Sequence, residues 1–167
     1  MRPPDRRQQR TRMALLAAFR DLMFAERYDR INVAAVCERA NVGRSTFYAH
    51  FPGKDALLAA SMQPLLSTLA DVAVSGDSPS LLWLLAHFWE QRRHGRVVFA
   101  PPLRRILERE LADRIHERLG PAQRIAALQI AAAQLTIIDA WMTGGVSATP
   151  AELAARLSAT ARLVTPP

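Results

Sequence analysis

The sequence predicts an all-α protein. Apolar residues recur with helical spacing through most of the 167 residues, and no strand-like alternation persists beyond a few residues. Proline and glycine lie mostly between the apolar runs, where loops are expected, so we expect about eight helices and no sheet. The single cysteine, Cys37, excludes an internal disulfide framework and fits a reducing compartment. The polar, Arg-rich start lacks the apolar stretch of a secretion signal, which indicates a cytoplasmic protein.

The net charge of +7 is concentrated in the first third of the chain. Residues 1–55 carry 11 basic and 6 acidic side chains, whereas residues 56–167 carry 11 and 9. A basic excess of this kind is expected where part of a protein faces a polyanion. A solvated N-terminal tail would give the same composition, so charge alone does not decide the partner.

The first third also has the most informative pattern of helices. A first amphipathic helix is expected over residues 6–27, and Asn32 can cap a second one, which ends before the turn Asn41-Val42-Gly43. Asparagine and glycine both tolerate left-handed backbone angles. A third, short helix then runs from Arg44 to His50. Two short helices joined by a tight turn are the helix-turn-helix pattern, whose second helix enters the major groove of DNA.

The third helix divides its side chains as a recognition helix must. Val42, Phe47 and Phe51 are the candidates for packing inward. The polar side chains remain for the outer faces: Arg44, Ser45, Thr46, Tyr48 and His50.

A family resemblance appears at this point. Residues 44–54 read RSTFYAHFPGK and follow VCERANV at 36–42, and together they resemble the TetR-type transcriptional regulators over about Gln9 to Leu58. Asn41 and Arg27 stand where that family usually has glycine. The resemblance implies a three-helix DNA-binding domain over residues 1–56. It also implies a helical domain over residues 57–167 for dimerisation and effector binding.

The predicted DNA contacts combine residue chemistry with this resemblance. Arg44 is suited to bidentate contact with guanine, and Ser45 and Thr46 can reach base edges or phosphates. Four basic residues, Arg2, Arg6, Arg7 and Arg10, are expected to form an arm along the DNA backbone or a minor groove. The resemblance adds phosphate contacts from Asn32, Tyr48, His50 and Lys54. Each residue taken singly also has a structural explanation: Thr46 as a cap, Tyr48 in packing, His50 on the surface, and the arm idle.

The rest of the chain is expected to be a helical bundle. Pro64 should kink or split a helix that begins near Gly53, and Ser78-Pro79 should begin the next one. A helix following Pro101-Pro102 carries a mixed-charge outer face with a Glu110–Arg114 pair, which is most simply solvated. The helix over residues 121–143 is apolar nearly all round, and its polar residues make a buried position more favourable than a bilayer. These are Gln129, Gln134, Thr136 and Asp139.

The last helix begins with a capping box formed by Thr149 and Glu152, with proline at the first helical position. The last two helices are the predicted homodimer interface, because the apolar helix needs more partners than one small protomer offers. The rival interpretation places both helices in a monomer core. The predicted interface residues are Leu128, Leu135, Ile138, Trp141, Leu153, Leu157 and Ala161.

An effector cavity for a small apolar or aromatic molecule is a further hypothesis. Its candidate lining consists of Met62, Trp83, Phe88, Trp89 and Phe99, which could equally be core residues. His87, Glu90 and His94 fall at metal-ligand spacing on one helix face, but surface or interface positions explain them better. Nucleophile-elbow, phosphate-loop and metalloprotease motifs are absent, so we expect neither catalysis nor a cofactor.

The sequence therefore predicts a dimeric DNA-binding regulator, acting as a repressor at a palindromic operator and released by a small-molecule effector. Two alternatives stay open. One is a helical adaptor with an inactive DNA-binding module, and the other is a small metal-dependent enzyme centred on His87, Glu90 and His94.

Overall fold

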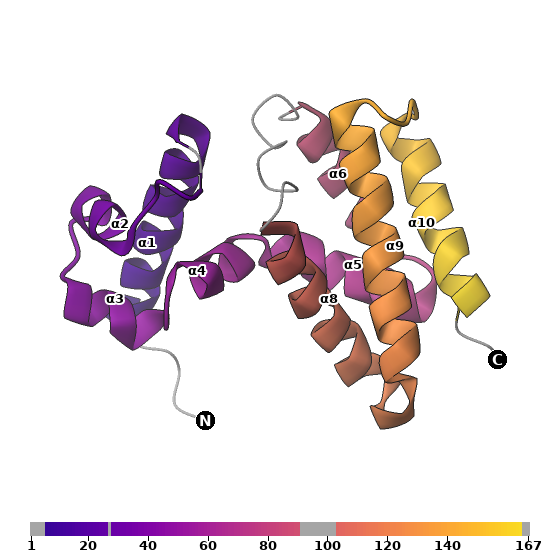
Figure 1. The fold of residues 1–167 in the computed structure, drawn as a ribbon, viewed down its shortest axis with the longest axis horizontal. Helices are drawn as coiled ribbons and strands as arrows, with labels where there is room; N and C mark the ends of the chain where they lie inside the picture. Colours follow the sequence, from indigo (N-terminus) through magenta and orange to yellow (C-terminus); the bar gives the residue numbers. More distant parts are fainter. Residues whose placement is uncertain (1–5, 27, 91–102, 165–167) are drawn as a thin grey trace. The chain divides into compact units, whose positions relative to one another are not determined.

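The computed structural model describes residues 6–26, 28–90 and 103–164 (Figure 1). Within these ranges the regular elements are nine α-helices and one short 3-10 helix, and none is a strand. The chain divides into two compact units, residues 1–62 and 63–167. The division follows α4, so the helix that begins at Lys54 belongs to the first unit.

The first unit contains four helices. They are α1 (Arg6–Ala25), α2 (Val33–Ala40), α3 (Arg44–His50) and α4 (Lys54–Ser61). α1 packs against both α2 and α4, and α2 contacts α3. Leu15, Phe19, Phe47 and Leu57 are fully buried at the centre of this unit. The helices at the start of the chain thus follow the predicted bounds within one or two residues.

The second unit begins at a break in the helix, as the position of Pro64 predicts. α4 ends at Ser61, and α5 (Gln63–Ser75) starts after Met62 with Pro64 as its second residue. Proline is tolerated there because the first amides of a helix have no partner within it. The predicted start of the next helix is wrong by two residues. A turn closed by the Leu81 amide and the Ser78 carbonyl precedes α6 (Leu81–Glu90).

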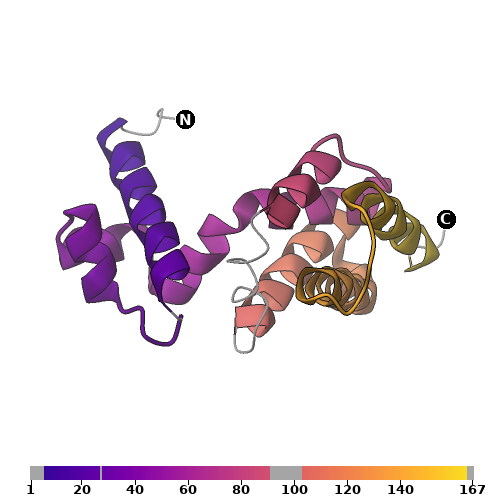
Figure 2. The same cartoon turned by 90° about the horizontal axis from the view of Figure 1, so that it is seen from above.

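The remaining helices of the second unit form one bundle with α5 and α6 (Figure 2). They are α8 (Leu103–Leu119), the 3-10 helix η2 (Pro121–Gln123), α9 (Arg124–Thr143) and α10 (Pro150–Val164). α8 packs on α5 and α9, and α10 packs on α5, α6 and α9. These contacts bury apolar residues of every α-helix in this unit.

α9 is the central apolar helix of the second unit. With η2 it is long and apolar enough to cross a membrane by composition alone. Its buried face nevertheless packs inside the unit, and Ile130, Leu135 and Ile138 are at most 1% exposed. Gln134 is also buried, and its Nε2 donates to the Leu69 carbonyl at 3.2 Å. α9 is therefore a core helix, as its polar residues predict.

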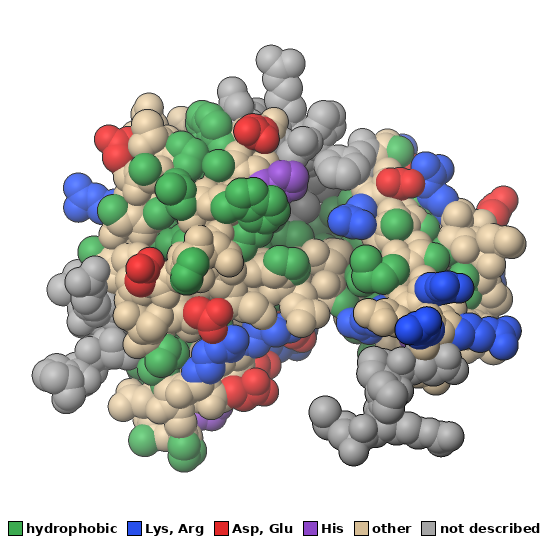
Figure 3. Space-filling view, turned by 180° about the vertical axis from the view of Figure 1, so that it is seen from behind, with side chains coloured by type: hydrophobic (Ala, Val, Ile, Leu, Met, Phe, Trp, Pro, Cys, Tyr) green, Lys and Arg blue, Asp and Glu red, His purple; other side chains and the backbone are tan. Residues whose placement is uncertain are grey.

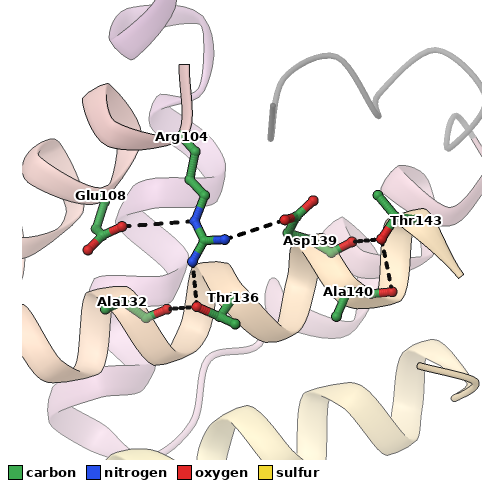
Figure 4. A network of polar contacts seen from close by, with 7 residues as sticks. All are labelled: Arg104, Glu108, Ala132, Thr136, Asp139, Ala140 and Thr143. Atoms are coloured by element: carbon green, nitrogen blue, oxygen red, sulfur yellow. Dashed lines mark hydrogen bonds and ion pairs between the residues drawn. The ribbon is translucent and has the colours of Figure 1, made fainter. Parts of the chain in front are cut away.

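The charged face of α8 is not simply solvated, which corrects the sequence prediction. Arg104 approaches Glu108 at 3.9 Å and Asp139 at 3.4 Å, and it donates to the Thr136 hydroxyl (Figure 4). Arg124 pairs with Asp113 at 2.6 Å, which adds a second link between α8 and α9. The predicted Glu110–Arg114 pair is not among the ion pairs of the described residues.

The capping box of α10 is confirmed. The Thr149 amide donates to Glu152 Oε2 at 2.8 Å, and the Glu152 amide donates back to Thr149 Oγ1 at 3.2 Å. The Thr149 amide and then its hydroxyl lower the pKa of the Glu152 carboxyl, because both donate to the charged form.

Candidate nucleic-acid interface

Two asparagines set the geometry of the helix-turn-helix. Asn32 caps α2, and its Oδ1 accepts from the Ala35 amide at 2.9 Å. Asn41 ends α2 in the left-handed conformation, with φ 52° and ψ 49°. In that conformation the Val42 amide reaches the Cys37 carbonyl at 2.9 Å and turns the chain into α3. The predicted cap and the predicted turn are both confirmed.

α3 separates an apolar face from a polar one, as predicted. Phe47 is fully buried and Phe51 is 3% exposed. Tyr48 is 57% exposed, and its ring meets the Phe47 ring edge-on at 5.3 Å between centroids. Three further side chains are exposed on the first turn of the helix: Arg44, Ser45 and Thr46. His50 and Val42 are half-buried. The exposed set can therefore reach a ligand without any change in the core of the unit.

The basic residues of the predicted arm lie partly in the first helix, which the sequence also predicts to begin at residue 6. Arg6, Arg7 and Arg10 lie in the first two turns of α1, whereas Arg2 lies outside the described residues. All three are exposed, and basic side chains project from several places on the first unit (right in Figure 3). A helix fixes the spacing of these charges, which a flexible arm would not.

Lys54 has partners that sequence reasoning missed. Its Nζ donates to the carbonyls of Tyr28 and Ile31, each at 3.0 Å, and lies 4.3 Å from the centre of the Tyr28 ring. The Tyr28 hydroxyl donates to Asp55. The resemblance implied a phosphate contact for Lys54, but its ammonium group is directed to the loop between α1 and α2. No sequence signal identifies this loop as the partner, because the two segments are more than twenty residues apart.

Comparisons with known proteins relate the first unit to one family of regulators. The model of bacterial regulatory proteins of the tetR family matches residues 15–61. The uncharacterized HTH-type transcriptional regulator YxbF of Bacillus subtilis (strain 168) is 34% identical over 77 residues, which cover 46% of this chain and 20% of that protein. The matched segment thus spans about a fifth of that relative.

Solved structures extend the likeness to the second unit at the level of the fold. A TetR transcriptional regulator from Streptococcus agalactiae 2603V has a TM-score of 0.57 and 24% identity, over 94% of this chain and 96% of that one. Another from Rhodococcus sp. RHA1 has a TM-score of 0.57 and 16% identity, over 96% and 97%. Residues 15–61 are thus similar to the TetR family, and the fold of the chain is similar to that of solved TetR regulators.

The predicted effector residues have different surroundings in the structure. Met62 is buried in the first unit, Trp83 is 66% exposed and stacks on His87, and Trp89 stacks on Trp141 at 4.6 Å. Phe88 is half-buried, and Phe99 lies outside the described residues. The structure has a groove of about 520 Å³ elsewhere, between α9 and α10. None of the predicted effector residues lines this groove.

Most of the predicted dimer residues belong to the core of the protomer, which corrects the prediction. Five of them are at most 2% exposed within a single chain: Leu135, Ile138, Trp141, Leu153 and Leu157. The side chain of Ala161 is not described. Leu128 is 44% exposed, and its neighbour Ile125 is 74% exposed. Periodicity located the apolar faces of both helices, but it could not separate the face that packs inside the protomer from the one left outside.

The candidate metal ligands are not assembled into a site in the described part of the chain. His87 stacks on Trp83 with an interplanar angle of 4°, which gives its ring a different neighbour. His94 lies outside the described residues. No group of three or more metal-binding side chains occurs among the described residues.

Proposed function

We propose that this protein is a DNA-binding transcriptional regulator that reads its operator with α3. One observation carries the proposal: Phe47 and Phe51 anchor α3 in the core while the whole polar first turn faces outward. This arrangement follows a left-handed turn at Asn41, and it lies inside the segment that matches the family model. A helix presented in this way fits the major groove of B-DNA.

The exposed residues divide into two chemical roles. Arg44 is placed to read guanine O6 and N7, and Ser45 and Thr46 can reach base edges or phosphates beside it. Tyr48, His50 and the α1 residues Arg6 and Arg10 supply contacts to the phosphate backbone. Because phosphate contacts release counterions, they provide affinity for any sequence, whereas base contacts provide preference for one.

A two-fold homodimer is the second part of the proposal. A palindromic operator presents two half-sites about one helical turn apart, or a multiple of it, and a symmetric dimer matches this spacing. The exposed apolar residues Ile125 and Leu128 at the start of α9 are the candidates for burial between protomers. An isolated protomer leaves them in water, which favours association.

The third part of the proposal is that the protein represses transcription in the cytoplasm and that a small molecule relieves this repression. α4 and α5 are consecutive helices that connect the two units through Met62. An effector that binds the second unit and favours one arrangement of these helices would change the spacing of the two recognition helices in a dimer.

The test is DNA binding by the purified full-length chain. Genomic fragments that flank its gene are titrated in a gel-shift assay at low and moderate salt, with an unrelated fragment of equal length as the control. Retention of one flanking fragment above the control supports the regulator. Equal behaviour of all fragments, or no retention at low salt, would favour an adaptor that has lost DNA reading.

A further inference from the structure

The start of α4 is hydrogen-bonded to the loop between α1 and α2. Lys54 donates two hydrogen bonds of 3.0 Å into this loop, one to each of the carbonyls of Tyr28 and Ile31. The loop is itself a tight turn, because the Ile31 amide donates to the Tyr28 carbonyl at 3.2 Å. Hydrogen bonds from a charged donor are stronger than neutral ones, so this contact fixes the loop more firmly than an ordinary side-chain bond.

The side chain of the next residue of α4 is also hydrogen-bonded to this loop. Asp55 accepts a hydrogen bond from the hydroxyl of Tyr28, which is 6% exposed. Burial, followed by the hydrogen bond to Asp55 and its charge, raises the pKa of Tyr28 well above its ordinary value. The hydroxyl therefore stays protonated and remains a donor at physiological pH. The Phe19 ring meets Tyr28 edge-on at 6.3 Å between centroids, which holds the Tyr28 ring against α1.

The loop between α1 and α2 leads directly into the helix-turn-helix. Ile31 is 1% exposed, and the residue after it, Asn32, caps α2. At the other end of the motif, three residues, 51–53, connect α3 to α4. The pair α2–α3 is thus tied to the start of α4 twice, once through the chain and once through the contacts of Lys54 and Asp55.

We propose that Lys54, Asp55 and Tyr28 form a latch that joins the α1–α2 loop to α4, so that α4 and the helix-turn-helix move as one piece. The three are positioning residues for DNA reading, and this role rests on the proposed function. The latch assigns the Lys54 ammonium group to backbone carbonyls inside the protein and not to a DNA phosphate. A lysine whose ammonium group is hydrogen-bonded within the protein and touches no phosphate contributes no counterion release when DNA binds.

Two variants and one matched control test the latch in the full-length protein. Lys54→Met removes the donors and keeps the apolar stem, and Tyr28→Phe removes only the hydroxyl. Arg30→Ala removes one positive charge from the same loop at an exposed position outside the latch. The first measurement is amide hydrogen exchange over residues 28–36 without DNA, which reports local opening. We expect Lys54→Met to speed exchange there on the order of tenfold, Tyr28→Phe to speed it less, and Arg30→Ala to leave it unchanged.

The second measurement is the salt dependence of DNA affinity. Lys54→Met should weaken specific binding on the order of tenfold while the slope of log affinity against log salt stays at its wild-type value. A slope reduced by about one would identify a phosphate contact and overturn the latch. Wild-type exchange in both Lys54→Met and Tyr28→Phe would also overturn it. If Lys54→Met does not fold, Tyr28→Phe decides the exchange result.

The exchange measurement also keeps the two proposals separate. A wild-type protein that binds no DNA would refute the proposed function, whereas the exchange rates of the loop need no DNA. The latch and the regulator can therefore fail independently.

Discussion

The guanidinium carbon of Arg12 lies 4.6 Å from the centre of the Phe51 ring, over its face. This cation–π contact joins the middle of α1 to the residue that ends α3. The end of the recognition helix is therefore supported from α1 as well as by the burial of Phe51. The polar side chains in the first turn of α3 are therefore not needed to pack the helix against the rest of the unit.

Arg44→Ala should reduce sequence preference more than it reduces general affinity. The loss of a bidentate contact to guanine is expected to cost about 1–3 kcal/mol at the operator and less on unrelated DNA. Arg10→Ala removes an exposed charge on α1, so it should weaken both DNAs alike and reduce the salt slope by about one. Fluorescence anisotropy titrations at several salt concentrations measure both quantities. Identical behaviour of the two variants would contradict the division into base-reading and phosphate-binding residues.

The left-handed Asn41 gives a prediction about stability. Asn41→Ala should destabilise the first unit by about 1 kcal/mol, because alanine keeps the Cβ that disfavours φ 52° but loses the side-chain amide whose local hydrogen bonding lets asparagine adopt this angle. Asn41→Gly should be neutral or slightly stabilising. Ala34→Gly, at the second residue of α2, is the control at a right-handed position and should cost up to roughly 0.5–1 kcal/mol. Thermal unfolding followed by circular dichroism ranks the variants, and a glycine at position 41 that costs as much as one at position 34 would refute the prediction.

The capping box of α10 predicts a dependence of stability on pH. The pKa of Glu152 is lower in the folded state, so its contribution is fully present above the ordinary value of 4.5 and is lost as the pH falls through the folded value. Glu152→Gln keeps an acceptor for the Thr149 amide and does not titrate. The wild-type protein should therefore lose its advantage over Glu152→Gln in acid. Melting temperatures measured from neutral to acidic pH test this, and a gap that is independent of pH would argue against the charged cap.

The exposed start of α9 predicts the oligomeric state. Ile125→Asp and Leu128→Asp should each convert the proposed dimer into a monomer of 18.5 kDa, because a carboxylate would lose its hydration in an apolar interface. Leu82→Asp on α6 is the control, since Leu82 is also half exposed but lies on another helix. Light scattering of the three variants gives their masses. A dimer that survives both α9 substitutions would place the interface elsewhere.

The sequence predicts the helix caps, the turn and the helix break well because their signals are local. The caps at Asn32 and Thr149, the turn at Asn41 and the break before Pro64 each depend on residues within a few positions of one another. The separation of Phe47 from Tyr48 follows from helical spacing in the same way. Local patterns of this kind give the helix bounds and the exposed face of α3.

The features that the sequence does not predict depend on contacts between distant segments. Lys54 finds carbonyls more than twenty positions earlier, and Arg104 finds Asp139 on a different helix. The choice of interface residues on α9 and α10 was affected for a related reason. Leu153 and Leu157 have the apolar spacing of an interface, but the protomer already buries them. Hydrophobic periodicity shows that a face is covered and leaves open which chain covers it.

The buried bond from Gln134 to the Leu69 carbonyl restricts the motions that are open to the second unit. Shear of α9 along α5 by one helical turn would remove this bond and leave the amide group in an apolar core, where its Oε1 already has no partner within the described residues. An allosteric response in this unit should therefore keep the register of α9 on α5 and act by rotating helices as rigid rods.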